Sequence, residues 1–585
     1  MVEHDGDWIY WILDAFETRA VYLFPAPVKE IGGTKWGYID AKGEFVLEPI
    51  YEDAKDFQDN GLAVVGMMDK SGLIDDNGYF IVKPKYDTIQ PFSEGRAVVN
   101  DSQGFKVIDE SGKEITEKAY SVAFPEYKER RLLVEETDVN GQYLYGFLNK
   151  SGKVVIPIIY QSASDFSEGK AVVKRKNGSF ELIDLTGNVL QTYSLAFVDY
   201  YGQGLLVYKK SEDGKFGYVD EQGKTVIEPQ FSSAESFIDD RAIVGLTVKN
   251  NNRFGVIDRK GNFVLKPNYT SIMNLGENRF AIGKELAPEQ PCLRSIYALA
   301  DSEGRILTGF IFKDINTFYD GLASVSDDQY TFYIDKNGKR MEHLPMVSGN
   351  GWLSFEKTLI KGDVDNRLVY FNRNGEEVWK QAAIIPLNNH YSVVEHKYRP
   401  NMEYLVYYPQ VHGMENPDMV NKTLKELAGV KPVPAGKQLE SNYTGDFEIN
   451  FYKKNLLVIE INGYDYMFCA AHGMPVKKYV HINLRNGSMY QLKDLFKSGS
   501  PYVKVLSAII LDQIKSNEQY SYLFPDEYHG IKADQPFFIS EGALNIYFKP
   551  YEIAAFVAGF PTFTLPFDEL KDIINQSGEF WKSFH

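Results

Sequence analysis

The sequence predicts a mainly β protein, with an array of about ten short β-meander repeats followed by an α+β domain. Three observations predict this fold class. One pattern, first seen in residues 35–65, recurs about ten times before residue 400. Each copy contains an Asp or Asn with a Gly three positions later, which is typical of a turn. Tyr and Phe are also abundant (39 and 38, against 6 Trp), and aromatic side chains suit strands with one face in water.

The Asp or Asn and its Gly mark the hairpin corner of each repeat. Successive corners lie between 34 residues (Asp75 to Asp109) and 43 residues (Asp258 to Asp301) apart. The Asp side chain can cap backbone N–H groups, and Gly takes the positive φ of a tight turn. The spacing lacks the dense oxygen ligands of a calcium loop. The ten pairs are Asp40/Gly43, Asp75/Gly78, Asp109/Gly112, Asn149/Gly152, Asp184/Gly187, Asp220/Gly223, Asp258/Gly261, Asp301/Gly304, Asp335/Gly338 and Asn372/Gly375.

The copy that begins at Phe216 illustrates one unit. Residues 216–219 are predicted as a strand, and residues 225–227 return as the second strand, which Pro229 ends because proline cannot donate to the ladder. The crossing segment that follows directs Phe237 inward and leads to a third strand. We therefore expect a three-stranded meander that straddles the sequence repeat, plus a crossing segment.

A second glycine recurs between two aromatic or aliphatic residues of the first strand. We expect either a neighbouring aromatic ring or another backbone to lie close to it. This glycine stands at Gly37, Gly146, Gly217 and Gly255.

Neighbouring repeats are expected to share a hydrophobic core. Ten meanders exceed the four to eight blades of a typical β-propeller. The sequence therefore favours an open, superhelical or solenoid-like array, with a β-propeller-like arrangement as the alternative. Copies near Trp36, Tyr145 and Phe216 are complete, whereas those after Tyr297 degrade, as terminal repeats do.

After about residue 395 the pattern becomes α+β. Apolar residues near the helical period predict helices at 416–428 and 501–515. The domains expected are a helix-like lead-in over residues 1–20, the array over 21–395 and the α+β domain over 401–585. Further expected elements are strands at 404–408, 447–462 (paired about a turn at 453–455), 464–471, 479–484, 537–540 and 544–548, and helical segments at 492–496 and 567–574.

Two resemblances accompany these patterns. The run W-G-Y-I-D…G…V-x-E-P-x-Y…F…G-L-A-V resembles the WG β-repeat family of bacterial proteins over about residues 21–380, and only Trp36 keeps its Trp. That resemblance implies interaction or assembly. The runs AHGMPVKKYVHINLRNGSMYQLKDLF and FFISEGALNIYFKPYEIAAFVAGFPTFTLPFDEL resemble the RsiV-like domain. Members of that family form the sensing part of lysozyme-sensing anti-sigma factors and lie beside peptidoglycan deacetylases, which implies a ligand- or protein-binding domain.

Charge and composition exclude several function classes. The net charge of −17 argues against nucleic acid and against anionic lipid as partners. The N-terminus is acidic and lacks the features of a secretory signal. No stretch approaches the ~20 apolar residues that a membrane span needs. The protein is therefore expected to be cytoplasmic, with envelope association left open. Cys292 and Cys469 form neither a disulfide framework nor a zinc spacing.

Candidate binding residues lie in the α+β domain. Glu552 is expected either to bind a ligand or, as we favour, to fix its loop by accepting backbone N–H groups. Cys469, His472 and the more distant His481 make at most half a metal site, and Cys469 is expected to be a small buried residue. We predict no catalytic residue, cofactor or metal. The candidate ligand- or partner-binding residues are His472, Lys549, Tyr551, Glu552 and Gly559.

These features predict a non-enzymatic bacterial interaction or scaffold protein. The array would be a binding platform, the C-terminal module would sense a ligand or protein, and the partner would be a protein or a cell-wall glycan. One alternative is an accessory or catalytic subunit that acts on peptidoglycan or the cell envelope, which two carboxylates and a His in one pocket would favour. Another is a purely structural spacer without any concave pocket.

Overall fold

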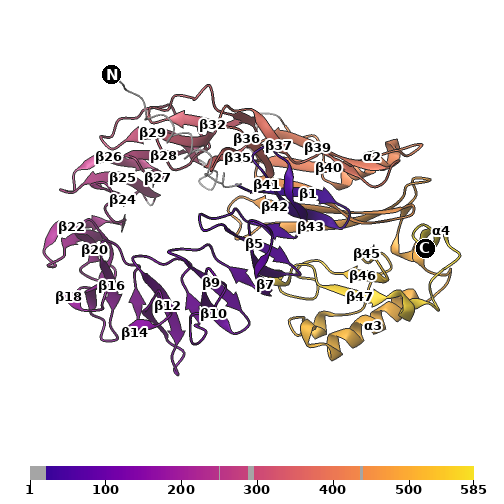
Figure 1. Cartoon of the computed structure of the whole chain (residues 1–585), viewed down its shortest axis with the longest axis horizontal. Coiled ribbons are helices and arrows are strands. Elements are labelled where there is room, and N and C mark those ends of the chain that lie inside the picture. Colours follow the sequence, from indigo (N-terminus) through magenta and orange to yellow (C-terminus); the bar gives the residue numbers. More distant parts are fainter. Residues whose placement is uncertain (1–21, 250, 287–294, 435–438) are drawn as a thin grey trace, which may run out of the picture. The chain divides into compact units, whose positions relative to one another are not determined.

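The computed structural model describes residues 22–249, 251–286, 295–434 and 439–585. The chain divides into two compact units. Among the described residues, the array comprises residues 36–380 together with residues 22–26, and the C-terminal unit comprises residues 381–585 together with Pro27–Lys35. The helix expected before residue 20 lies outside the described residues. Figure 1 labels the strands and helices along the chain.

Ten sheets of three or four strands make up the described part of the array, which confirms the mainly β fold class; the outer parts of β1 and β2 belong to the C-terminal unit. In chain order the sheets are β1 (Phe24–Glu30), β2 (Gly33–Ile39), β3 (Phe45–Tyr51); β4 (Asp53–Ala54), β5 (Leu62–Met67), β6 (Lys70–Asp75), β7 (Phe80–Tyr86); β8 (Thr88–Ile89), β9 (Arg96–Asp101), β10 (Gly104–Asp109); β11 (Val122–Ala123), β12 (Arg131–Thr137), β13 (Tyr143–Asn149), β14 (Val154–Tyr160); β15 (Ser162–Ala163), β16 (Lys170–Lys174), β17 (Phe180–Asp184), β18 (Val189–Tyr193); β19 (Phe197–Gly202), β20 (Leu205–Lys209), β21 (Phe216–Asp220), β22 (Thr225–Phe231); β23 (Ser233–Ala234), β24 (Arg241–Val248), β25 (Asn251–Asp258), β26 (Phe263–Tyr269); β27 (Ser271–Asn274), β28 (Arg279–Glu285), β29 (Ser295–Asp301); β30 (Asp314–Ile315), β31 (Leu322–Ser326), β32 (Tyr330–Asp335), β33 (Met346–Ser348); and β34 (Gly351–Glu356), β35 (Leu359–Val364), β36 (Arg367–Phe371), β37 (Glu377–Lys380).

All ten predicted corners are hairpin turns. At one of them, Asp220 Oδ1 accepts hydrogen bonds from the backbone N–H groups of Gln222 and Lys224 (3.1 and 2.8 Å), and the N–H of Gly223 donates to Asp220 O (2.9 Å). The same two side-chain bonds recur at the other nine corners, among them those of Asp40, Asp75, Asp258 and Asp335. The capping interpretation of the repeated Asp is therefore confirmed.

The corner glycines have the positive φ that the sequence predicts. All ten values lie between 77° and 86°. At the five corners taken as defining the repeat, φ is 86° (Gly43), 81° (Gly78), 81° (Gly223), 84° (Gly261) and 79° (Gly338).

Positive φ is nevertheless an incomplete explanation of these glycines, because several also lie against another sheet. A Cβ atom on Gly43 would lie 2.6 Å from the carbonyl oxygen of Val378 in β37, the last strand of the array. A Cβ on Gly78 would lie 3.0 Å from Leu47 Cδ2 of the preceding sheet, and one on Gly261 would lie 3.1 Å from Ile227 Cγ2. At Gly338 it would collide with Cγ2 of Thr308, which lies between β29 and β30. At these four corners the prediction of positive φ holds, and contacts between sheets additionally leave little room for a side chain.

The second strand of the repeat is longer than predicted. Pro229 does not end it, because β22 continues to Phe231 through a bulge between the pairs Tyr218↔Ile227 and Phe216↔Phe231. The bulge presses this backbone against Gly217, where a Cβ atom would lie only 2.4 Å from the carbonyl oxygen of Ile227. The expected close approach of another backbone is thus confirmed. The corresponding distances at the other three glycines are 2.4 Å (Gly37), 2.7 Å (Gly146) and 2.5 Å (Gly255).

Neighbouring sheets share their cores. Tyr218 of β21 lies in one buried cluster with Phe231, Phe237 and Val244, which belong to or border the following sheet. Such shared burial explains why one repeat alone cannot form a hydrophobic interior.

The first and last sheets of the array also pack together. Ile39 of β2 lies in one buried cluster with Leu359 of β35 and Tyr370 of β36. The last sheet also reaches the second one, because Lys361 Nζ of β35 lies 2.6 Å from Oδ2 of Asp56, which lies between β4 and β5. Of the two arrangements predicted for the array, the propeller-like one agrees with these contacts.

The C-terminal unit is α+β, as predicted. Its seven-stranded sheet has the order β38-β39-β40-β41-β42-β43-β44, and β45-β46-β47 form a second sheet that shares a buried core with α3. The elements are β38 (Ile384–Pro386), β39 (Ser392–Asn401), β40 (Tyr404–His412), α2 (Asp418–Leu427), β41 (Ser441–Lys453), β42 (Leu456–Met467), β43 (Met474–Asn483), β44 (Met489–Tyr490), η1 (Leu492–Leu495), α3 (Tyr502–Ser516), η2 (Glu518–Tyr520), η3 (Pro525–Glu527), β45 (Phe537–Ser540), β46 (Ala543–Tyr547), η4 (Phe556–Ala558), β47 (Thr562–Pro566), η5 (Phe567–Leu570) and α4 (Glu579–Lys582).

Two expected elements of this unit are wrong. Residues 464–467 prolong β42 instead of starting a new strand, and the chain then leaves the sheet in a loop. The helix expected at 567–574 is reduced to the 3-10 turn η5, and Ile574 forms a β-bridge with Phe496, which draws the chain out of helical geometry.

The segment Pro27–Lys35 is built into the C-terminal unit. The backbone N–H of Gly32 donates to Ile449 O (2.8 Å). The buried Lys29 ammonium lies 3.1 Å from Glu395 Oε2 and 2.8 Å from Asp446 Oδ1. Residues distant in sequence thus complete this unit.

Candidate functional site

Two loops of the C-terminal unit carry the predicted site residues. The loop between β42 and β43 carries His472, and the loop between β46 and β47 carries Lys549, Tyr551, Glu552 and Gly559.

The repeat-defining residues belong to a different part of the chain. They lie at hairpin corners of the array, where they shape turns and pack between sheets, and they contribute no side chain to these two loops. They are Asp40, Gly43, Asp75, Gly78, Asp220, Gly223, Asp258, Gly261, Asp335 and Gly338.

His472 and Tyr551 touch one another. Tyr551 Oη lies 3.1 Å from His472 Nε2, while His472 Nδ1 lies 3.0 Å from Gly473 O. The His472 ring stacks on Phe556, with centroids 4.0 Å apart and an interplanar angle of 25°. We refer to His472, Tyr551 and Phe556 as the aromatic ledge.

Glu552 holds the shape of the second loop. Its Oε2 accepts a hydrogen bond from the Lys549 N–H (3.0 Å), and its own N–H donates to Lys549 O (3.1 Å). Its Oε1 lies 3.2 Å from Lys532 Nζ. Both carboxylate oxygens are therefore engaged, which is the loop-fixing arrangement favoured for Glu552 on sequence grounds.

Tyr551 has a backbone conformation that a bulky residue rarely adopts. Its φ is +68°, and its side chain is 58% exposed. The left-handed region costs a non-glycine residue about 1–2 kcal/mol, and such strain gathers at functional sites. Gly559, at φ +61°, closes the turn of η4, where its N–H donates to Phe556 O (3.0 Å).

A pocket of about 410 Å³ adjoins Tyr551, and we refer to it as the loop pocket. It offers two cationic side chains, two carboxylates and the amide of Gln535. Gln535 is buried, and its Nε2 donates to Tyr547 O (3.0 Å). The lining residues are Lys532, Asp534, Gln535, Pro536, Lys549, Pro550, Tyr551 and Glu552.

Two tyrosines, the buried Tyr547 and the partly buried Tyr479, fix the strands that carry the two loops. Tyr547 Oη at the end of β46 donates to Lys477 O of β43 (3.2 Å). Tyr479 Oη donates to Glu460 Oε2 of β42 (2.6 Å), and burial first, then this carboxylate, raises the pKa of Tyr479. The phenol therefore stays a hydrogen-bond donor at neutral pH.

The remaining candidates do not gather into a metal site. His481 is fully buried and stacked on Phe537 (4.2 Å, 3°), and this burial lowers its pKa to about 3. Cys469 is exposed and disulfide-bonded, so the expectation of a small buried residue is wrong. Within the described ranges, no group of three or more His, Cys, Asp or Glu side chains is placed to hold a metal ion.

Sequence reasoning missed Phe556 and Lys532. Phe556 could have been found as an aromatic residue between Pro550 and Pro561, in a loop already singled out. Lys532 had no such signal, because it reaches Glu552 only through the fold.

No helix in the part of the chain that the structure describes has both the length and the apolar character needed to cross a membrane.

Comparisons with known proteins agree with the sequence motifs. The family model of the WG containing repeat matches residues 36–70, 72–101, 145–179, 216–246, 254–285 and 297–330. The family described as a protein of unknown function (DUF3298) matches residues 493–568, within the part that resembles the RsiV-like domain.

One curated relative is the peptidoglycan-N-acetylmuramic acid deacetylase PdaC of Bacillus subtilis (strain 168). It is 27% identical over 164 residues, which are 27% of this chain and 34% of that protein. The chain thus spans about a third of the length of this relative.

The solved structures that match this chain are more remote in sequence, and their TM-scores are low. A DUF3298 family member from Bacteroides fragilis NCTC 9343 is 14% identical, covering 33% of this chain and 94% of that chain, with a TM-score of 0.26. BamB from Moraxella catarrhalis is 12% identical, covering 48% of this chain and 95% of that chain, with a TM-score of 0.29. From the family matches and the folds of its two units, the chain combines WG containing repeats in its N-terminal two thirds with a C-terminal DUF3298 segment.

Proposed function

We propose that this protein is a bacterial, envelope-associated binding scaffold whose C-terminal unit holds a cell-wall glycan on the aromatic ledge. The observation that carries the proposal is Tyr551, an exposed ring held at positive φ and hydrogen-bonded to His472. Strain of this kind is maintained where it serves function.

The chemistry of the site suits a sugar. The C–H faces of a sugar ring are apolar and pack on aromatic rings, while its hydroxyl and acetamido groups need hydrogen-bond partners. The ledge supplies the rings, and the adjoining loop pocket supplies Lys549, Asp534 and Gln535. Two lysines and two carboxylates balance there, which suits a ligand without net charge.

Two further observations support an envelope location. The curated relative is, by its name, a peptidoglycan deacetylase, although only a third of its length is matched. Cys469 is disulfide-bonded, and disulfides persist in oxidising compartments outside the cytoplasm.

The two alternatives predicted from the sequence fit the geometry less well. The loop pocket holds two carboxylates, Asp534 and Glu552, but no His, so the set of two carboxylates and a His is incomplete there, and Glu552 is engaged through both of its oxygens. A pure spacer would have no concave pocket, whereas the loop pocket measures about 410 Å³.

Sedimentation with purified, protein-free peptidoglycan sacculi tests the proposal. The full-length protein should be depleted from solution, and Tyr551→Asn should lose most of this binding. Asn tolerates positive φ, so this variant removes the ring without straining the loop. Tyr143→Asn is the matched control, since Tyr143 is 61% exposed and lies in the array. Wild-type protein that stays in the supernatant, or a Tyr551→Asn variant that still sediments, would contradict the proposal.

A further inference from the structure

One position of the repeat, two residues before the corner Asp or Asn, distinguishes the sheets. In six of the ten copies an apolar residue without a hydroxyl group occupies it. These residues are Leu73, Val107, Phe147, Leu182, Val256 and Leu299. The other four copies have the buried tyrosines Tyr38, Tyr218, Tyr333 and Tyr370.

Three of these tyrosines donate to a backbone carbonyl of the adjacent sheet. Tyr38 Oη donates to Lys55 O (2.8 Å), Tyr218 Oη to Glu235 O (2.7 Å) and Tyr370 Oη to Pro25 O (2.8 Å). Each tyrosine ring also packs on a phenylalanine close to that carbonyl. The pairs are Tyr38 with Phe57 (4.8 Å), Tyr218 with Phe237 (4.9 Å) and Tyr370 with Phe24 (5.6 Å).

The carbonyls that serve Tyr38 and Tyr218 come from crossing segments. Residues 55–61 join β4 to β5, and residues 235–240 join β23 to β24. Each segment carries its carbonyl and, two positions later, its phenylalanine. The tyrosine hydroxyl is therefore the anchor for a crossing segment of the next sheet.

Tyr333 lacks this partner. In the following sheet only Lys357 and Thr358 separate β34 from β35, so there is no crossing segment. Phe355 supplies the ring, stacked on Tyr333 at 4.9 Å and 23°. No carbonyl reaches the hydroxyl, since Tyr333 is 3% exposed and its Oη has no hydrogen-bond partner among the described residues.

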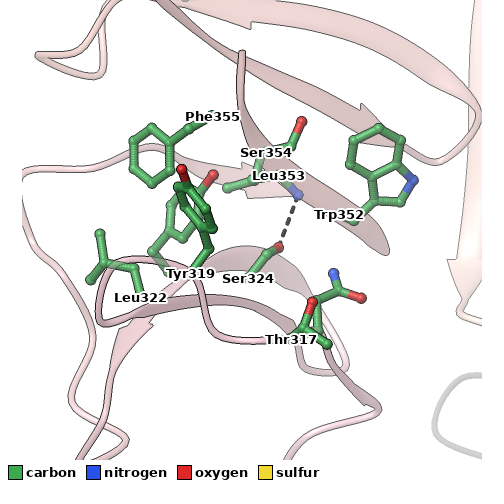
Figure 2. A pocket seen from close by; sticks show the side chains of 10 residues that line it. Thr317, Tyr319, Leu322, Ser324, Trp352, Leu353, Ser354 and Phe355 are labelled. Carbon is green, nitrogen blue, oxygen red and sulfur yellow. Dashed lines mark hydrogen bonds between the residues drawn. The ribbon is translucent and has the colours of Figure 1, made fainter. Parts of the chain in front are cut away.

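An open pocket of about 530 Å³ is lined in part by Tyr333. Figure 2 shows Tyr319 and Phe355 on one side of it, with Trp352 and Thr317 on the other. Its lining is mainly apolar and aromatic, and none of its ten described residues is charged. They are Asn316, Thr317, Tyr319, Leu322, Ser324, Tyr333, Trp352, Leu353, Ser354 and Phe355.

Ser324 adds a second polar group beside Tyr333. The two residues face each other in the register of β31 and β32, so their side chains share one face of the sheet. Ser324 Oγ accepts the N–H of Leu353 (2.9 Å) and keeps its own proton for a further acceptor. Two buried hydroxyl groups, each with a proton to donate, therefore belong to residues that line a mainly apolar and aromatic pocket.

We propose that this pocket binds an extended peptide segment of a partner protein, which takes the place of the missing crossing segment. One backbone carbonyl of that peptide accepts the hydrogen bond of Tyr333 Oη. An aromatic or large apolar side chain, two residues further on, packs against Tyr319, Trp352 and Phe355. Recognition needs no charge on this side chain.

The chain itself provides a probe for the test. The blocked pentapeptide acetyl-Ser-Ala-Glu-Ser-Phe-amide has the sequence of residues 233–237 and contains the carbonyl and ring that serve Tyr218. In ligand-observed NMR titrations of the full-length protein it should bind saturably. Replacing its Phe with Ala should weaken binding about tenfold or more, because a buried ring is lost. Tyr333→Phe should weaken binding about fivefold, the effect of one neutral hydrogen bond.

Two exposed tyrosines give a matched control. Tyr319→Ala should weaken binding, whereas Tyr79→Ala should not, although the two side chains are similarly exposed (76% and 73%). The proposal would be overturned if no saturable binding occurs up to about 10 mM peptide, a concentration that still detects a binding free energy near about −3 kcal/mol. Undiminished binding by Tyr333→Phe would also overturn it. So would a neutral trisaccharide, chitotriose, that binds in a Tyr333-dependent way where the peptide does not.

Discussion

Removing one hydroxyl group should have opposite consequences at two equivalent positions of the array. Tyr218→Phe deletes the donor of the 2.7 Å bond to Glu235 O, while Tyr333→Phe deletes a buried hydroxyl that has no described partner. Both tyrosines are almost fully buried, and both rings keep a phenylalanine neighbour at 4.9 Å. The pair therefore isolates the hydrogen bond from the packing.

The size of the change in stability depends on whether removing the hydroxyl leaves a hydrogen-bond partner unsatisfied. Tyr218→Phe leaves the Glu235 carbonyl without this bond, which costs about 1–3 kcal/mol. Tyr333→Phe removes a polar atom whose burial is uncompensated, so the stability of the array should be unchanged or higher. For a domain of several hundred residues, 2 kcal/mol corresponds to a fall in Tm of about 2–4 °C.

Thermal unfolding of the ligand-free, full-length protein, followed by calorimetry, checks this prediction. The array transition should fall for Tyr218→Phe and stay or rise for Tyr333→Phe. Tyr38→Phe provides a third case and should behave like Tyr218→Phe, since its hydroxyl donates to Lys55 O at 2.8 Å. Equal destabilisation by Tyr218→Phe and Tyr333→Phe would refute the reasoning, because Tyr333 would then have a partner within the chain.

Four further changes have defined outcomes. Gly217→Ala should lower the free energy of unfolding by about 2 kcal/mol or more in thermal melts, because its Cβ would lie 2.4 Å from a carbonyl oxygen. Gly309→Ala is the control and should cost under about 1 kcal/mol, because the nearest atom to its Cβ would be 3.6 Å away. Lys29→Met should destabilise the C-terminal unit by about 2–5 kcal/mol, since it removes the cation buried between two carboxylates, and an unchanged melt would contradict that role. His481 takes up a proton below about pH 6.5 in the unfolded state, but only near pH 3 in the folded state. The free energy of unfolding of the C-terminal unit should therefore fall by about 2 kcal/mol between pH 6.5 and pH 5, and His481→Leu should reduce that fall, as chemical denaturation at the two pH values would measure. Cys469 should resist alkylation in denaturant until a reductant is added, as peptide mass spectrometry would detect.

Features fixed by neighbouring residues could be predicted from the sequence. A corner such as Asp220 to Gly223 depends on one carboxylate, two N–H groups and one positive φ, all within five residues. The close approach at Gly217 could be predicted for the same reason. A glycine that recurs at one position of a repeat indicates that another part of the chain lies too close for a side chain. Tyr551 and Glu552 stood out because they follow Pro550 just beyond the end of a predicted strand.

Features that depend on distant contacts could not be predicted. Ile39 packs with Leu359 only because the first and last sheets meet, and no local pattern marks that meeting. The corner glycine Gly43 lies against Val378 O for the same reason, although its turn alone accounts for its positive φ.

The sequence also did not predict the local course of the chain where contacts with another segment determine it. Pro229 was expected to end its strand, yet the bulge opposite Gly217 accommodates a residue without an N–H. Phe556 joins the ledge through the path of its loop, and that path depends on hydrogen bonds made by Glu552.

The environment of Tyr333 could not be read from its own repeat. Its local sequence, Tyr-Ile-Asp, is nearly that of Tyr218, Tyr-Val-Asp, and both precede a corner of the same kind. The difference lies some 20 residues later, where the loop between β34 and β35 is too short to supply a carbonyl. The other copies define what this position needs, because six carry no hydroxyl and three pair their hydroxyl with a backbone oxygen. Because the described part of the chain supplies no acceptor for the buried Tyr333 hydroxyl, this position supports the proposal that a partner molecule supplies one.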